Sequence, residues 1–249
     1  MAGKDMRWSG ASAEVFSSTW MGPMKNGFAV RVFLLILLVF VAGCSKAPPC
    51  PTVRLGNVSI VAPVPAGFNA TSTAAPQFFE QMMVRTAPTL VLVEFYITDA
   101  DLRDVRAGYS KRRSKTMDMH TRRDFLSLDY SQYIFDSTAS IIRSNAVSDV
   151  ASWKAAAVEH VMSGGKDSAP LGVVYDKPGG IGTAEMHDHK TADGIDKVTT
   201  VSILVRVRRR ALFLVCSSSV NNAEDSKNVE YACSDWADSV LSSNAEVKQ

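Results

Sequence analysis

A run of apolar residues from Val32 to Ala42 stands just before Cys44 and separates two unlike parts of the chain. The run is too short to cross a hydrocarbon core about 30 Å thick, which needs about 20 residues in a helix. Lys25 and Arg31 place positive charge before it, as in the first part of a secretory signal. We therefore expect residues 1–43 to be a signal peptide, so that the fold is built only from the residues that follow.

The residues Val41, Ala42, Gly43 and Cys44 resemble the lipobox of bacterial lipoproteins. The resemblance implies that signal peptidase II cleaves before Cys44 once its thiol carries a diacylglyceryl group, which makes Cys44 the site of lipid attachment. The alternatives are an ordinary transmembrane anchor and a type I signal peptide with an incidental cysteine. In this family a residue other than Asp after the cysteine usually directs export to the outer membrane. Ser45 therefore predicts an outer-membrane lipoprotein that faces the periplasm.

The rest of the chain divides into an upstream extension, a tether and a folded part. Residues 1–23 are polar and of mixed charge, unlike a signal peptide, so we expect translation to begin at Met21 or Met24. Residues 44–56 predict a lipidated N-terminus and a proline-rich tether, because proline cannot continue a helix or a central strand. Residues 57–249 suffice for one core and predict a single globular domain.

The charge balance excludes one class of partner. The chain has 27 Lys and Arg and 25 Asp and Glu, of which residues 1–43 hold four and two, so 23 of each remain. A general nucleic-acid binder needs a basic excess, so we expect no nucleic-acid partner. The expected partners are membrane lipid, through the anchor, and an envelope protein or glycan. Apart from the covalent lipid on Cys44, we expect no cofactor.

Apolar periodicity predicts an α+β fold in which helices cover an antiparallel sheet. Helical spacing predicts one helix that begins at Gln77 and a second in which Tyr133, Ile134, Ile141 and Ile142 form one stripe. A third helix is expected from Ser148 to near Met162. Asp99 is expected to open a short helical turn. Extended patterns predict seven strands, over residues 58–62, 89–97, 115–122, 171–175, 182–190, 198–208 and 211–218.

An amphipathic helix over residues 224–243 closes the chain. Val229, Cys233, Trp236 and Val240 are spaced for one face of that helix. The last hairpin and this helix, from Val198 to Leu241, resemble the end of PsbP-like α/β sandwiches. The resemblance implies a similar sandwich and carries no chemical motif.

Three of the four cysteines remain once Cys44 is assigned to lipid. Disulfides persist outside the cytosol, and Cys216 at the end of a strand can meet Cys233 on the apolar face of the last helix. The alternative is two buried thiols that pack as small apolar side chains. We expect Cys50 to be unpaired.

A possible metal site lies in the predicted strand over residues 182–190. Glu185, His187 and His189 point to one side of a strand, because side chains alternate with period two. Two imidazoles and a carboxylate suit zinc or copper, and His120 is a further candidate ligand. We favour the other interpretation, a solvated strand face with Ala184 and Met186 toward the core, and expect no metal site.

Basic clusters occur at residues 111–113, 122–123 and 206–210. They could bind anionic headgroups, or they could be solvated loop ends that prevent association through strand edges. We favour the second interpretation. Ser163 has the spacing of a catalytic Ser-x-x-Lys motif, but it ends a predicted helix instead of beginning one. No Gly-x-Ser-x-Gly motif of a serine hydrolase occurs. We expect a non-catalytic envelope binding domain. The alternatives are a metal-binding lipoprotein and a hydrolase of unrecognised type.

Overall fold

The structure is a computed structural model, and the residues that it describes fall in five stretches: 51–109, 113–145, 162, 168–191 and 194–245. Residues 48–249 form one unit. Cys44, Cys50 and the residues of the expected signal peptide and lipobox lie outside the described residues. So does the helix expected from Ser148, except for Met162.

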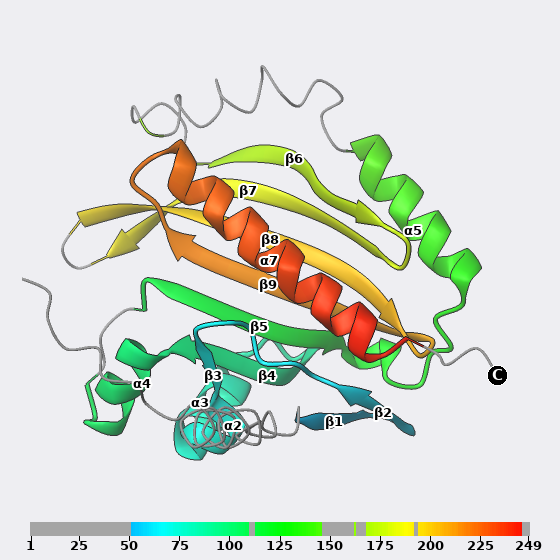
Figure 1. The fold of residues 1–249 in the computed structure, drawn as a ribbon, viewed down its shortest axis with the longest axis horizontal. Helices are drawn as coiled ribbons and strands as arrows, with labels where there is room; N and C mark the ends of the chain where they lie inside the picture. Colours follow the sequence, from blue (N-terminus) through cyan, green and yellow to red (C-terminus); the bar gives the residue numbers. More distant parts are fainter. Residues whose placement is uncertain (1–50, 110–112, 146–161, 163–167, 192–193, 246–249) are drawn as a thin grey trace, which may run out of the picture. The chain divides into compact units, whose positions relative to one another are not determined.

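Seven strands form one antiparallel sheet in the order β3-β4-β5-β9-β8-β7-β6 (Figure 1). Their bounds along the chain are β3 Phe68–Ala70, β4 Leu90–Thr98, β5 Lys115–Arg122, β6 Ser168–Lys177, β7 Gly180–Thr191, β8 Gly194–Val207 and β9 Arg210–Ser219. Alternation sends Met117, Val201 and Cys216, which are neighbours in the register, to the same face of the sheet. The predicted α+β class and the C-terminal antiparallel meander are confirmed.

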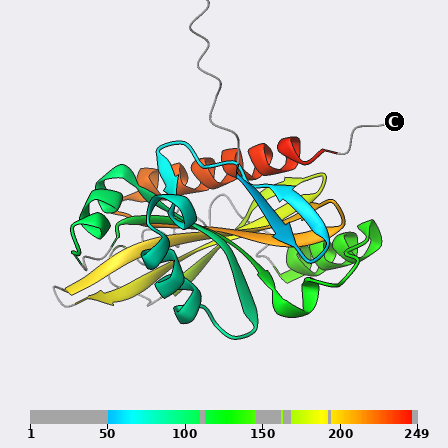
Figure 2. The same cartoon turned by 90° about the horizontal axis from the view of Figure 1, so that it is seen from below.

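Helix α7, Ala223–Ser243, covers one face of this sheet (Figures 1 and 2). Val229, Cys233, Trp236 and Val240 are all buried, as their spacing predicts. The Trp236 indole N–H donates to the carbonyl oxygen of Pro63 at 2.9 Å, and its ring packs edge-on against Tyr96. The closing helix therefore joins the sheet to the chain segment that enters it.

Helices α3, Pro76–Arg85, and α5, Gln132–Asn145, pack on the opposite face (Figure 2). The predicted stripe of α5 is wrong in two positions, because Tyr133 is 80% exposed and Ile141 is 60% exposed. Phe135 and Ala139, one turn apart, are the buried residues of α5 and pack in one cluster with Ile181 of β7. The buried stripe is therefore rotated toward Phe135.

The described part of the chain also has two short helices and a 3₁₀ turn: α2 Thr71–Ala74, α4 Asp99–Arg106 and η1 Arg123–Phe125. Helix α4 begins at Asp99, as expected, but its cap is the preceding residue. Thr98 Oγ1 accepts a hydrogen bond from the backbone N–H of Asp101 at 3.2 Å.

A hairpin of β1, Thr52–Leu55, and β2, Val58–Val61, corrects the predicted tether boundary. The tether was expected to extend to residue 56, yet β1 pairs with β2 and the chain is already folded at Thr52. Gly56 forms the turn at φ 58°, and a side chain there would meet the Leu126 carbonyl oxygen at 2.5 Å. The alternation of Val53 and Leu55 against polar neighbours was the signal for β1.

Asn244, at the end of α7, links this hairpin to the helix. Its side-chain oxygen accepts from the Val61 N–H at 2.9 Å, and its amide donates to the Val61 and Val240 carbonyl oxygens, both at 2.8 Å. Asn244 is 3% exposed, so water cannot replace these bonds.

We expect Asn244→Ala to lower the free energy of unfolding by about 2 kcal/mol, because it leaves buried backbone groups of Val61 without partners. Urea denaturation followed by circular dichroism measures the change. Ser242→Ala, two residues earlier on the exposed side, is the matched control. Equal stability of the Asn244→Ala and Ser242→Ala proteins would contradict the role assigned to Asn244.

Cys216 and Cys233 form a disulfide between β9 and α7, with their Cα atoms 5.9 Å apart and a separation of 17 positions in the sequence. Closing a loop of this size stabilises a fold by about 3 kcal/mol in the chain-entropy model.

Replacement of both Cys216 and Cys233 by serine should therefore lower the free energy of unfolding by about 3 kcal/mol. The control is dithiothreitol, which should shift the unfolding midpoint of the wild-type protein but leave that of the double variant unchanged. A wild-type midpoint that does not respond to full reduction, verified by thiol counting, would refute the contribution of this disulfide.

Candidate functional site

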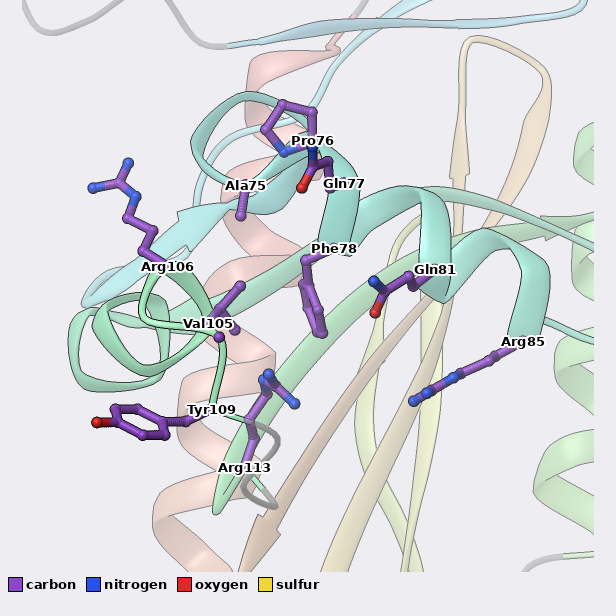
Figure 3. A pocket seen from close by; sticks show the side chains of 11 residues that line it. Ala75, Pro76, Gln77, Phe78, Gln81, Arg85, Val105, Arg106, Tyr109 and Arg113 are labelled. Atoms are coloured by element: carbon purple, nitrogen blue, oxygen red, sulfur yellow. The ribbon is translucent and has the colours of Figure 1, made fainter.

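A pocket of about 560 Å³ opens between α3 and the chain that follows α4 (Figure 3). Its lining combines arginine, glutamine, aromatic and small residues: Ala75, Pro76, Gln77, Phe78, Gln81, Arg85, Val105, Arg106, Gly108, Tyr109 and Arg113. The volume lies within the range of small-molecule sites, about 300–1,000 Å³.

Buried polar contacts of β4 hold the short helix α2, which leads into α3. Thr71 Oγ1 donates to the Phe95 carbonyl oxygen at 2.7 Å. The Ser72 N–H donates to Glu94 Oε1 at 3.0 Å, and Glu94 is 1% exposed. A buried carboxylate is tolerated here because backbone and hydroxyl donors surround it. These bonds fix where α3 begins on the sheet.

Helix α3 presents two faces of different character. Pro76 stands at its start, where a missing N–H costs nothing. Phe78 is buried against the ring of Phe95, with the ring centroids 5.9 Å apart. Gln77, Gln81 and Arg85 repeat every four residues, so they form one polar stripe along the pocket.

Arg113 forms the opposite wall of the pocket. Its guanidinium carbon lies 4.2 Å from the centroid of the Phe78 ring, a cation–π contact. Burial lowers the pKa of Arg113, and the positive charge of Arg85 lowers it further. The negative charges of Asp101 and Asp104 oppose this change. Arginine stays protonated at neutral pH all the same. The positive charges of Arg85 and Arg113 therefore act on each other in this pocket, which Arg106 also lines.

The remaining arginine and the tyrosine lie at the rim. Arg106 Nε and Nη2 donate to the Ala74 carbonyl oxygen at 3.3 and 3.1 Å, which ties α4 to the end of α2. In Figure 3 the end groups of Arg106 and Tyr109 point away from Phe78, whereas Gln81, Arg85 and Arg113 lie around it. We call the group of Phe78, Gln81, Arg85 and Arg113 the inner site.

The chemistry of the lining is that of recognition. Guanidinium and amide groups donate hydrogen bonds, and the aromatic ring offers a flat apolar surface. No Asp, Glu, His, Ser or Cys is among the described residues that line the pocket, so proton transfer there has no obvious donor or acceptor pair.

The sequence reasoning missed this pocket, because Arg85 and Arg113 are far apart in the chain. One signal was present, namely the four-residue repeat of Gln77, Gln81 and Arg85 opposite the apolar side of α3. Of the basic cluster at 111–113, only Arg113 is described.

The weak candidates for metal ligands on β7 do not converge. His187 Nδ1 lies 3.8 Å from Glu185 Oε1, too far for a hydrogen bond. Across the described stretches, no group of three or more His, Cys, Asp or Glu residues could hold a metal ion. Glu185 and His189 are exposed, and neither converges with His187 on one point. Alternate residues of a strand share a face, but a metal site also needs further ligands from neighbouring strands, and the described residues supply none here.

His120 instead pairs with Asp118, at 2.7 Å between Nδ1 and Oδ1, and its ring stacks on Phe213. The pair lies in a second hollow of about 280 Å³, which shares Arg85 with the first pocket. No serine, threonine or cysteine in the described part of the chain shows a hydrogen bond to His120, so a nucleophile for a hydrolase is not seen beside this pair.

The basic cluster at 206–210 mostly serves the fold. Arg206 and Arg210 donate to the carbonyl oxygens of Tyr130 and Leu128, and Arg208 donates to that of Ser59. Arg209 pairs with Asp129. These contacts join the β8–β9 turn to the β1–β2 hairpin and to the chain before α5. The arginines of this cluster therefore have structural partners that the predicted solvated loop ends would lack.

Comparisons with known proteins add little. No protein-family model matches the chain, and no curated protein sequence matches it. Among solved structures, it is similar to the Ran-binding protein Mog1p of Saccharomyces cerevisiae, at 13% identity and a TM-score of 0.29, over 78% of this chain and 91% of that one. A mutant of protein Mog1 is similar at 12% identity and a TM-score of 0.32, over 78% and 93%. Scores this low carry no argument about fold or function.

The helices of the described stretches were also compared with the length and hydropathy of a membrane span. None of those helices is long and apolar enough to cross a bilayer.

Because Glu185, His187 and His189 do not converge, we expect protein purified without a histidine tag to contain no stoichiometric zinc or copper by elemental analysis. Chelation with EDTA should leave the melting temperature unchanged, and the variant with His187→Ala and His189→Ala should behave like the wild type. One equivalent of metal that is lost in this variant would contradict the geometry.

Proposed function

We propose that this protein is a bacterial lipoprotein, anchored by lipid on Cys44, whose folded domain acts without catalysis by binding a component of the cell envelope. The residues of the lipobox support the anchor. Two or three acyl chains hold a protein stably on a membrane, whereas one is marginal. Ser45 supports an outer-membrane location facing the periplasm, and the C-terminal hairpin and helix support a PsbP-like sandwich.

The single observation that carries the binding role is the lining of the pocket beside α3. Hydrogen-bond donors and an aromatic face converge there, in a space large enough for a small ligand or for part of a larger partner. The partner is an envelope component, such as a protein or a glycan, that presents a group to this pocket.

In-cell photocrosslinking tests this function. A photoreactive amino acid in place of Gln77, at the pocket, should give a discrete adduct with an envelope component in intact cells. Gln132 on α5 is the matched control, since it is also an exposed glutamine but lies outside the pocket. The specific adduct should disappear when Gln81→Ala is added. No adduct at Gln77, or equal adducts at Gln77 and Gln132, would contradict binding through this pocket.

A further inference from the structure

We propose that the inner site binds a phosphoryl group between Arg85 and Arg113, with Gln81 as a neutral donor. The inference rests on the proposed binding function, which it deepens by naming the ligand class. The phosphoryl group belongs either to a soluble phosphate ester or to an anionic lipid headgroup, since both present the same oxygens.

The charges of the pocket favour an anion. Arg85, Arg106 and Arg113 line it, and no carboxylate does. Asp101 and Asp104 act on Arg113 from the side of α4, but neither lines the pocket. Like charges that the fold holds close to each other repel, and an anion placed between them removes that repulsion.

The geometry favours an oxyanion with several acceptor atoms. The Arg113 guanidinium carbon lies over the Phe78 ring, 4.2 Å from its centroid, so the N–H donors of this group lie at the aromatic wall of the pocket. Arg85 reaches toward the same space from the end of α3 (Figure 3). Within the described stretches Arg85 makes no hydrogen bond or ion pair, so its five donors can serve a ligand.

A phosphoryl group fits these donors better than a carboxylate does. Two guanidinium groups on opposite walls and an amide between them present donors from more than one direction. A carboxylate has two oxygens in one plane, whereas a phosphoryl group has three oxygens arranged as a pyramid, each able to accept from a different wall. Arginine forks pair with phosphate in this way, and a lysine point charge would not.

The test titrates inorganic phosphate into the lipidated full-length protein in neutral detergent by calorimetry, against chloride at equal ionic strength. Saturable phosphate binding is expected, weakened about tenfold or more by Arg85→Gln or Arg113→Gln. Arg103→Gln is the control, since Arg103 is an exposed arginine on α4 outside the pocket and its loss changes the net charge equally. Arg85→Lys, which keeps the charge, should recover binding only in part.

A second arm uses water-soluble dihexanoyl-phosphatidylglycerol, with dihexanoyl-phosphatidylcholine as its neutral counterpart. Tighter binding of the phosphatidylglycerol than of phosphate, with the same dependence on Arg85, assigns the group to a lipid headgroup. Tighter binding of phosphate assigns it to a soluble ester. Circular dichroism of each variant separates lost binding from lost folding, and Arg85, being exposed, is the safer position.

The inference is overturned if neither probe binds, or if Arg103→Gln weakens binding as much as Arg85→Gln. Failure here differs from failure of the binding function. A Gln77 adduct in cells without phosphoryl binding keeps the function and removes this ligand class. Phosphoryl binding without an adduct keeps the ligand class and removes the envelope partner.

Discussion

Trp236 lies where the sheet, helix α7 and the segment after β2 meet, with its ring against Tyr96 and its indole N–H bonded to Pro63. Burial of each large side chain around it contributes about 1.5–3 kcal/mol. Tyr96 belongs to β4 and Val201 to β8, so one helix packs on strands that are distant in sequence. A slip of one residue in any of these strands would move the side chains that pack on α7 to the other face of the sheet, and α7 therefore helps to fix the register.

The position of the pocket follows from that register. Strand β4 sends Tyr96 toward α7 and Phe95 to the opposite face, where Phe78 of α3 packs on it. Phe78 then supports Arg113 by stacking. The chain of contacts runs from α7 through β4 and α3 to the pocket, so the core places Phe78, on which Arg113 lies.

Arginine has two separate roles in this fold. The β8–β9 turn holds Arg208 and Arg209 at φ 46° and 60°, a conformation that residues with side chains rarely adopt. Hydrogen bonds to Ser59 and Asp129 stabilise that turn. Arg85, by contrast, lies in the pocket and contributes nothing visible to the core. A count of basic residues cannot separate these roles, since both look alike in sequence.

The periodic elements could be predicted, because their patterns are local. Strand β5 and helix α7 agree with their predicted ranges to within one residue, and Cys216 of β9 meets Cys233 of α7. The pocket could not be predicted, because Arg85 and Arg113 are far apart in the chain and line the same pocket only in the folded protein. Glu185 and His187 are close in sequence and share a face of β7, yet no third ligand joins them among the described residues, and sequence alone cannot show that. Strand β1 was missed because the proline-rich composition before it outweighed four alternating residues.

The lipid anchor is the claim that places this domain at a membrane, and mass spectrometry of the mature N-terminus tests it most directly. Protein extracted from bacterial membranes should begin at Cys44 and carry a diacylglyceryl modification on that residue, with or without a further acyl chain on its amino group. A peptide that runs unbroken through Gly43 and an unmodified Cys44 would contradict the account.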